Sequence, residues 1–237
     1  MNLPNALTVG RIAVTPLVAA LPFVERWEWR LVAFVLYILA AVTDYYDGML
    51  ARRRSQITRL GQLLDPAADK LLLVGTFVPM LLVSGAAALP WGDTTAAGAV
   101  LGPVPHDHGE ALLPFVTPLG RWGLPWWIFA IVIGREAFMT IFRQAAARRG
   151  VVIAAIGPAK WKTGFQSTWV GAAYFWFFAA TLAAERGWTA PAWRWFAHFN
   201  GIVGVVTMLG ATWLTLYSLV LYLRRFGGIF WGARAHG

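Results

Sequence analysis

Long apolar stretches alternate with short polar connections along most of the chain, and this pattern predicts membrane-spanning helices. Each stretch is close to the ~20 residues that a helix needs to cross the hydrocarbon core of a bilayer. Six spans are expected, which makes the fold an all-α polytopic membrane protein. The expected spans are Leu7–Val24, Trp29–Thr43 continuing into the DYYDG segment, Leu63–Ala88, Leu124–Ala147, Phe165–Ala184 and Phe199–Leu223.

The segments outside these spans complete one expected domain over residues 1–237. Met1–Thr8 is interpreted as a short interfacial segment that runs into the first span. It is not interpreted as a cleaved signal peptide, because Arg11 and Pro16 interrupt the apolar run and no basic residue precedes it. The connection at 89–123, rich in Gly, Pro and Ala, is expected to be a long external loop.

Lys and Arg are distributed unevenly between the two sides of these spans. The richer side carries Arg52, Arg53, Arg54, Arg59, Arg143, Arg148, Arg149, Lys160, Lys162, Arg224, Arg225 and Arg234. The poorer side carries Arg26, Arg30, Arg121, Arg186 and Arg194. Because basic residues favour the cytoplasmic side, both termini are expected in the cytoplasm. Tryptophans near the predicted span ends fit an interfacial belt.

Composition supports a membrane protein and removes several kinds of chemistry. Hydrophobic residues make up 58% of the chain and charged residues 13%. The chain has no cysteine, which excludes disulfides, thiolate metal sites and cysteine nucleophiles. The formal charge of +9 is interpreted as cytoplasmic loops that face anionic lipid, and no nucleic-acid partner is expected.

Four aspartates flank the loop between the second and third spans. Asp44 and Asp47 are three residues apart, Asp65 and Asp69 are four apart, and both spacings place two carboxylates on one helix face. Their mutual repulsion calls for cations between them, and oxygen-only ligands suit two Mg²⁺ or Mn²⁺ ions. The alternative is that these aspartates cap helices and pair with Arg52, Arg53 and Arg54.

Small residues and one arginine lie between the two acid pairs. Gly48, Ala51 and Gly61 let a bulky ligand approach the backbone, although small residues also mark plain helix packing in membranes. With Arg52 and divalent ions beside them, a nucleotide diphosphate is the natural ligand.

The run Asp44-x2-Asp47-Gly48-x2-Ala51-Arg52-x8-Gly61-x3-Asp65-x3-Asp69 resembles the signature of the CDP-alcohol phosphatidyltransferase family at every fixed position. The segments NLPNALTVGRIAVTPL, GQLLDPAADKLL, GREAFMTIFRQ and AKWKTGFQ are similar to the bacterial branch whose acceptor is glycerol 3-phosphate. The resemblance covers nearly the whole chain, except Gly85–Gly123, which is longer than expected for the family.

The resemblance implies six transmembrane helices, a homodimer in the bacterial inner membrane, and a site that faces the cytoplasm. It implies transfer of a phosphatidyl group from CDP-diacylglycerol to glycerol 3-phosphate with release of CMP. Asp44, Asp47 and Asp65 would bind metal, and Asp69 would bind the second ion and act as the general base. The residues that would contact CDP-diacylglycerol are Gly48, Ala51, Arg52, Thr58, Gly61, Asn5 and Thr8. Asn5 and Thr8 have an equal alternative role as caps of the first helix.

A dianionic acceptor phosphate needs cations, and the fourth and fifth spans supply candidates. Arg135 lies inside a span, where an unpaired arginine is costly, and Glu136 is next to it. Arg143, Lys160 and Lys162 are expected to complete a phosphate pocket. The alternative is that these three only add positive charge to the cytoplasmic side.

Other functions fit the sequence less well. Within the family, the main alternative is a cardiolipin synthase with phosphatidylglycerol as acceptor, followed by phosphatidylserine or phosphatidylinositol-phosphate synthases. A divalent-cation transporter is a distant alternative, because the aspartates lie at one boundary rather than at mid-membrane. The external motif His106–Glu110 is interpreted as a solvated loop rather than a zinc site.

Overall fold

The computed structural model describes residues 3–53, 59–85, 115–151, 153 and 157–228. Within these ranges, the side chains at 3–4, 45, 47–53, 59–63, 84–85, 120–121 and 158–160 are not described. Long helices dominate the described part. They are α1 Leu3–Ala20, α2 Trp27–Arg53, α3 Arg59–Gly85, α5 Trp126–Arg148, α6 Gly157–Glu185 and α7 Pro191–Phe226, with a 3₁₀ turn η1 at Leu21–Phe23.

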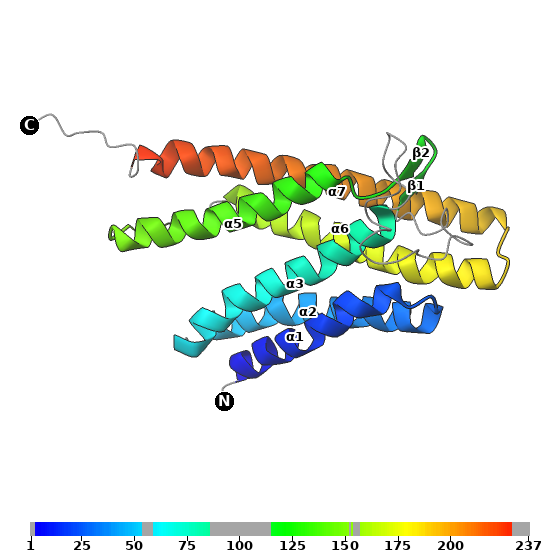
Figure 1. Ribbon diagram of the computed structural model, residues 1–237, viewed down its shortest axis with the longest axis horizontal. Coiled ribbons are helices and arrows are strands. Elements are labelled where there is room, and N and C mark those ends of the chain that lie inside the picture. The colour runs from blue at the N-terminus through cyan, green and yellow to red at the C-terminus, as the bar shows by residue number, and fades with distance from the viewer. Residues whose placement is uncertain (1–2, 54–58, 86–114, 152, 154–156, 229–237) are drawn as a thin grey trace, which may run out of the picture.

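The helices lie lengthwise in two groups, with α1, α2 and α3 below α5, α6 and α7 in the view of Figure 1. Within the groups, α1 packs against α2 and α3, and α7 packs against α5 and α6. Contacts between α2 and α6 join the groups. The buried Tyr174 of α6 also joins the groups, because its one hydroxyl proton is shared between the carbonyls of Val18 on α1, at 3.1 Å, and Gly75 on α3, at 3.3 Å.

Close packing in the first group depends on a small residue. An added Cβ at Gly75 of α3 would lie 2.8 Å from the Thr15 methyl group of α1. A side chain at this position would push the two helices apart. Glycine therefore allows α1 and α3 to pack closely against each other.

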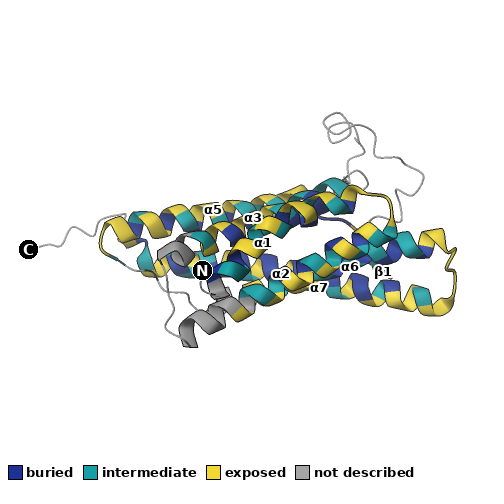
Figure 2. Ribbon diagram, turned by 90° about the horizontal axis from the view of Figure 1, so that it is seen from below, coloured by how far each residue is buried: buried dark blue, intermediate teal, exposed yellow. Residues whose placement is uncertain are grey.

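Exposed and buried residues alternate along the helices (Figure 2), and many of the exposed residues carry large apolar side chains. Leu39, Ile141, Val206 and Trp213 are each more than half exposed. Among the described residues, three segments are long and apolar enough to cross a bilayer: Asn5–Phe23, Leu64–Val83 and Pro191–Phe226. These features identify a helical membrane protein.

A short antiparallel hairpin precedes α5, made of β1 (Phe115–Thr117) and β2 (Gly120–Trp122). It packs against the N-terminal half of α7, where an added Cβ at Gly204 would lie 1.9 Å from the Phe115 ring. Both strands lie within the stretch 89–123 that was expected to be a long external loop, so the hairpin was not predicted. Residues 89–114 of that loop, including His106–Glu110, lie outside the described residues.

The helix boundaries can be compared with the predicted spans. The second span does continue into DYYDG, because α2 runs to Arg53. Helix α3 continues through Pro79. The interfacial start at Met1–Thr8 is not a separate element in its described part, because α1 begins at Leu3 and both Asn5 and Thr8 are buried.

Candidate active site

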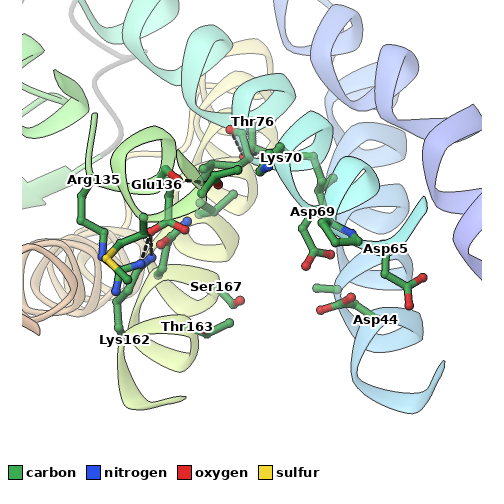
Figure 3. Close-up of a pocket in the computed structure, with 18 of the residues that line it drawn as sticks. Asp44, Asp65, Asp69, Lys70, Thr76, Arg135, Glu136, Lys162, Thr163 and Ser167 are labelled. Carbon is green, nitrogen blue, oxygen red and sulfur yellow. Dashed lines mark hydrogen bonds and ion pairs between the residues drawn. The ribbon is translucent and has the colours of Figure 1, made fainter. Parts of the chain in front are cut away.

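A cavity of about 540 Å³ lies between the two helix groups. Its lining comes from α1, α2, α3, α5 and α6, and it brings charges of both signs together (Figure 3). The charged lining residues are Arg11, Asp44, Asp65, Asp69, Lys70, Arg135, Glu136, Arg143 and Lys162. Six of the site residues predicted from sequence therefore line one space, although they are up to 118 positions apart (Asp44 to Lys162).

We call Asp44, Asp65 and Asp69 the acidic wall. Asp44 lies in the C-terminal half of α2, and the other two lie four residues apart in the N-terminal half of α3, where this spacing places them on one face. The side chains of Asp44 and Asp69 are 43% and 58% exposed, so their oxygens are open to a ligand. In Figure 3 both carboxylates are directed toward the space in front of α6, whereas Asp65 is turned away from it.

Helix α1 holds the acidic wall together from behind. The Arg11 Nη1 atom donates to Asp69 Oδ1 at 2.7 Å and also to Asp44 Oδ1, which makes one nitrogen a bridge between α2 and α3. The Thr8 hydroxyl donates to Asp65 Oδ1 at 2.8 Å. All three aspartates are thus connected to one helix. Thr8 does not cap that helix, because α1 begins at Leu3.

Sequence reasoning missed the role of Arg11. The signal was a polar stripe on an apolar helix, because Asn5, Thr8, Arg11 and Thr15 recur at three- or four-residue spacing and so share one helix face. The structure buries all four. Buried polar groups on an apolar helix need partners, so such a stripe marks the face that meets the other charged helices.

We call Arg135, Glu136, Arg143 and Lys162 the basic wall. Glu136 Oε1 accepts a hydrogen bond from Arg135 Nη1 at 2.7 Å and another from Lys162 Nζ. The side chains of Arg135 and Lys162 are only 6% and 7% exposed. One carboxylate therefore holds two buried cations from α5 and α6, and charge-assisted bonds of this kind fix both side chains.

Helix α7 supports the same wall from the outside. Arg135 Nη2 donates to Ser218 Oγ at 3.0 Å, and Arg143 Nη2 donates to the Tyr222 hydroxyl at 3.2 Å. Both guanidinium groups also lie over the Tyr222 ring, at 5.9 and 5.6 Å from its centroid. Arg135 and Arg143 therefore share one face of α5, and Tyr222 lies against both.

The acidic wall fits a hard cation in its chemistry. Its donors are carboxylate oxygens, which Mg²⁺ and Mn²⁺ prefer, and two of them converge on a single cationic atom of Arg11. This convergence shows that the wall needs positive charge at that point. Across the described residues, no group of three or more His, Cys, Asp or Glu side chains is placed to hold a metal ion, and the side chain of the fourth predicted ligand, Asp47, is not described.

Several predicted site residues cannot be placed. The surroundings of Gly48, Ala51, Arg52, Gly61 and Lys160 are not described, and Thr58 lies outside the described residues. Their assignments stay predictions. Asn5 is buried on α1, one turn before Thr8.

Comparison with known proteins places the chain in a family. A family model described as CDP-alcohol phosphatidyltransferase matches residues 1–221. A relative in Arabidopsis thaliana named CDP-diacylglycerol–glycerol-3-phosphate 3-phosphatidyltransferase 2 is 31% identical, over 95% of this chain and 79% of the relative. A Rickettsia bellii protein named CDP-diacylglycerol–glycerol-3-phosphate 3-phosphatidyltransferase is 43% identical, over 34% of this chain and 44% of its own.

A third relative carries a different name. An Oryza sativa protein named cardiolipin synthase (CMP-forming) is 28% identical, over 95% of this chain and 57% of its own. The family match extends over both walls of the cavity, from Asp44 to Lys162. The chain therefore belongs to the CDP-alcohol phosphatidyltransferase family.

Proposed function

We propose that this enzyme transfers the phosphatidyl group of CDP-diacylglycerol to glycerol 3-phosphate and releases CMP. The observation that carries the proposal is a cavity with an acidic wall on one side and a basic wall on the other. The donor pyrophosphate must be neutralised by cations, which an acidic wall can hold. The acceptor carries its own phosphate and needs the positive charge of a basic wall. The names of the Arabidopsis and Rickettsia relatives support the same reaction.

In the proposed mechanism, the acidic wall serves the donor. Asp44, Asp47, Asp65 and Asp69 would hold two divalent cations, Mg²⁺ or Mn²⁺, which neutralise the pyrophosphate when bound. Gly48, Ala51, Arg52, Thr58 and Gly61 would contact the CDP-diacylglycerol, with Asn5 and Thr8 nearby. The acceptor hydroxyl oxygen forms a bond to the lipid-side phosphorus, the bond from that phosphorus to the CMP oxygen breaks, and Asp69 takes the hydroxyl proton.

The basic wall serves the acceptor in this proposal. Three cations, Arg135, Arg143 and Lys162, face the cavity with one carboxylate, Glu136, among them. The wall therefore carries an excess of positive charge, which suits the dianionic phosphate of glycerol 3-phosphate. Lys160 would add to it from the start of α6. Glu136 fixes the side chains of two of these cations before the acceptor binds. Acceptor binding therefore loses little side-chain entropy at these two residues.

We place all six long helices across the bilayer, with the site and both termini on the cytoplasmic side of a bacterial inner membrane. The shortest of α2, α5 and α6 has 23 residues, which corresponds to about 34 Å of helix. The bias in Lys and Arg supports the orientation. We further propose that the protein works as a homodimer in the membrane, as the family resemblance implies.

Release of CMP by purified protein tests the acceptor. Supplied with CDP-diacylglycerol and Mn²⁺, the protein should release CMP with glycerol 3-phosphate and form phosphatidylglycerophosphate. The second candidate is cardiolipin synthesis, which the name of the Oryza relative favours. Release of CMP with phosphatidylglycerol but not with glycerol 3-phosphate would replace the first proposal by the second. Failure with both acceptors would reject each of them.

A further inference from the structure

Arg11 is placed where a cation bound by the acidic wall would be expected. Its Nη1 atom contacts carboxylate oxygens of both Asp44 and Asp69, and these two residues come from different helices. The side chain is 1% exposed, whereas the two carboxylates are about half exposed. The arginine therefore approaches the acids from the protein interior and leaves their cavity side open.

From this geometry we infer that Arg11 is a positioning residue and the resident counter-cation of the acidic wall. It holds the carboxylates of α2 and α3 together, and a divalent ion that enters from the cavity must share them with it. The inference rests on the metal-dependent part of the proposed function. It adds a residue outside the aspartate signature and assigns it a measurable effect on cation affinity.

The physical argument has two parts of opposite sign. Without Arg11, two close carboxylates repel each other, so the helices that carry them lose stability until a cation arrives. With Arg11, an entering divalent cation meets a fixed positive charge a few ångströms away, and this repulsion weakens its binding. Removing the arginine should therefore destabilise the cation-free protein and tighten cation binding at the same time.

A merely structural arginine would not produce this combination. Arg30 is the matched control, because it is also a buried arginine on a long helix. Its Nε donates to the Pro22 carbonyl at 3.1 Å and its Nη1 donates to the Thr181 hydroxyl, so no carboxylate accepts either of these bonds. It lies in the first turn of α2, 14 residues before Asp44 on the same helix.

The experiment compares the full-length wild-type, Arg11→Gln and Arg30→Gln proteins in detergent. Thermal unfolding is followed in EDTA and across a Mn²⁺ titration, and Mn²⁺ affinity is measured by electron paramagnetic resonance of the free ion. Arg11→Gln should lower the EDTA midpoint by roughly 4 °C or more. It should also enlarge the Mn²⁺-induced rise and tighten the Mn²⁺ Kd by about tenfold. Arg30→Gln should lower the midpoint with the Mn²⁺ rise and Kd unchanged.

A second variant keeps the test decisive if Arg11→Gln fails to fold. Arg11→Lys retains the charge but presents a compact ammonium on a different stem. Its Mn²⁺ Kd should be tighter than that of wild type and of Arg30→Gln, by less than the roughly tenfold change expected for loss of the charge. In an Asp69→Asn background, each Arg11 substitution should change the EDTA midpoint less than in wild type.

Three outcomes would overturn the inference. They are an equal Mn²⁺-induced rise in the unfolding midpoint of all variants, weaker Mn²⁺ binding after loss of Arg11, and no Mn²⁺ binding by any form. The proposed function fails separately, by absence of CMP release from wild type with either acceptor. A protein that releases CMP yet shows unchanged Mn²⁺ affinity in Arg11→Gln and Arg11→Lys would keep its function and lose this role for Arg11.

Discussion

The two walls of the cavity are built on the same plan with opposite charge. In the acidic wall, one buried arginine bridges carboxylates from α2 and α3. In the basic wall, one glutamate bridges cations from α5 and α6. In each wall, therefore, a single residue of the opposite sign holds two like charges that come from different helices. This arrangement lets a membrane protein bring many charges together without leaving them unpaired.

The walls differ in how open they are to a ligand. Asp44 and Asp69 are about half exposed, whereas Arg135 and Lys162 are nearly fully buried. Exposed carboxylate oxygens can take up an ion and a proton during a reaction. Buried and already bonded cations suit fixed electrostatic recognition of a phosphate. We therefore expect substitutions in the acidic wall to affect turnover and substitutions in the basic wall to affect stability and acceptor binding.

Asp69→Asn should give the largest effect. Asparagine keeps the shape and can still accept the Arg11 hydrogen bond, but it cannot take the acceptor proton. We expect turnover, measured as CMP release, to fall by about 10²–10⁴-fold. Binding of CDP-diacylglycerol should largely survive. The control is Glu25→Gln, at an exposed residue just before α2, with unchanged turnover. Unchanged turnover in Asp69→Asn would remove Asp69 as the base.

Glu136→Gln should give the next largest effect, which is a loss of stability. It leaves Arg135 and Lys162 buried without the carboxylate that both contact. Breaking a buried ion pair by removing one partner costs about 3 kcal/mol or more, which corresponds to a fall of roughly 6–12 °C in the unfolding midpoint. Glu185→Gln, at the exposed end of α6, should leave the midpoint unchanged. Equal midpoints for both variants would show that Glu136 does not hold the basic wall together.

Much of this architecture was predictable from the chain because it depends on local spacing. Apolar stretch lengths predicted the positions of the long helices, and the four-residue separation of Asp65 and Asp69 predicted a shared face. The Arg135 prediction came from the cost of an arginine in an apolar helix, and the structure buries and pairs it as that cost requires.

The remaining features depend on contacts between distant segments, which local patterns do not encode. Arg11 was interpreted as an interruption of an apolar run, yet its partners are 33 and 58 residues away. The contacts of Ser218 and Tyr222 with the basic wall depend on how α7 packs against α5. The hairpin at Phe115–Trp122 has strands of three residues, too short for an alternating pattern, and its site on α7 is provided by Gly204.

Lys162→Gln should give the smallest of these effects and should separate acceptor from donor binding. Glutamine can still donate to Glu136, so the wall keeps its geometry but loses one positive charge facing the cavity. Losing one charge-assisted contact to the acceptor phosphate costs about 1.5 kcal/mol, which should raise the KM for glycerol 3-phosphate by roughly tenfold. The KM for CDP-diacylglycerol should not change. Arg148→Gln, an exposed cation at the end of α5, controls for the general loss of positive charge and should leave both constants unchanged. If Lys162→Gln raised the donor KM instead, the assignment of the two walls to donor and acceptor would have to be reversed.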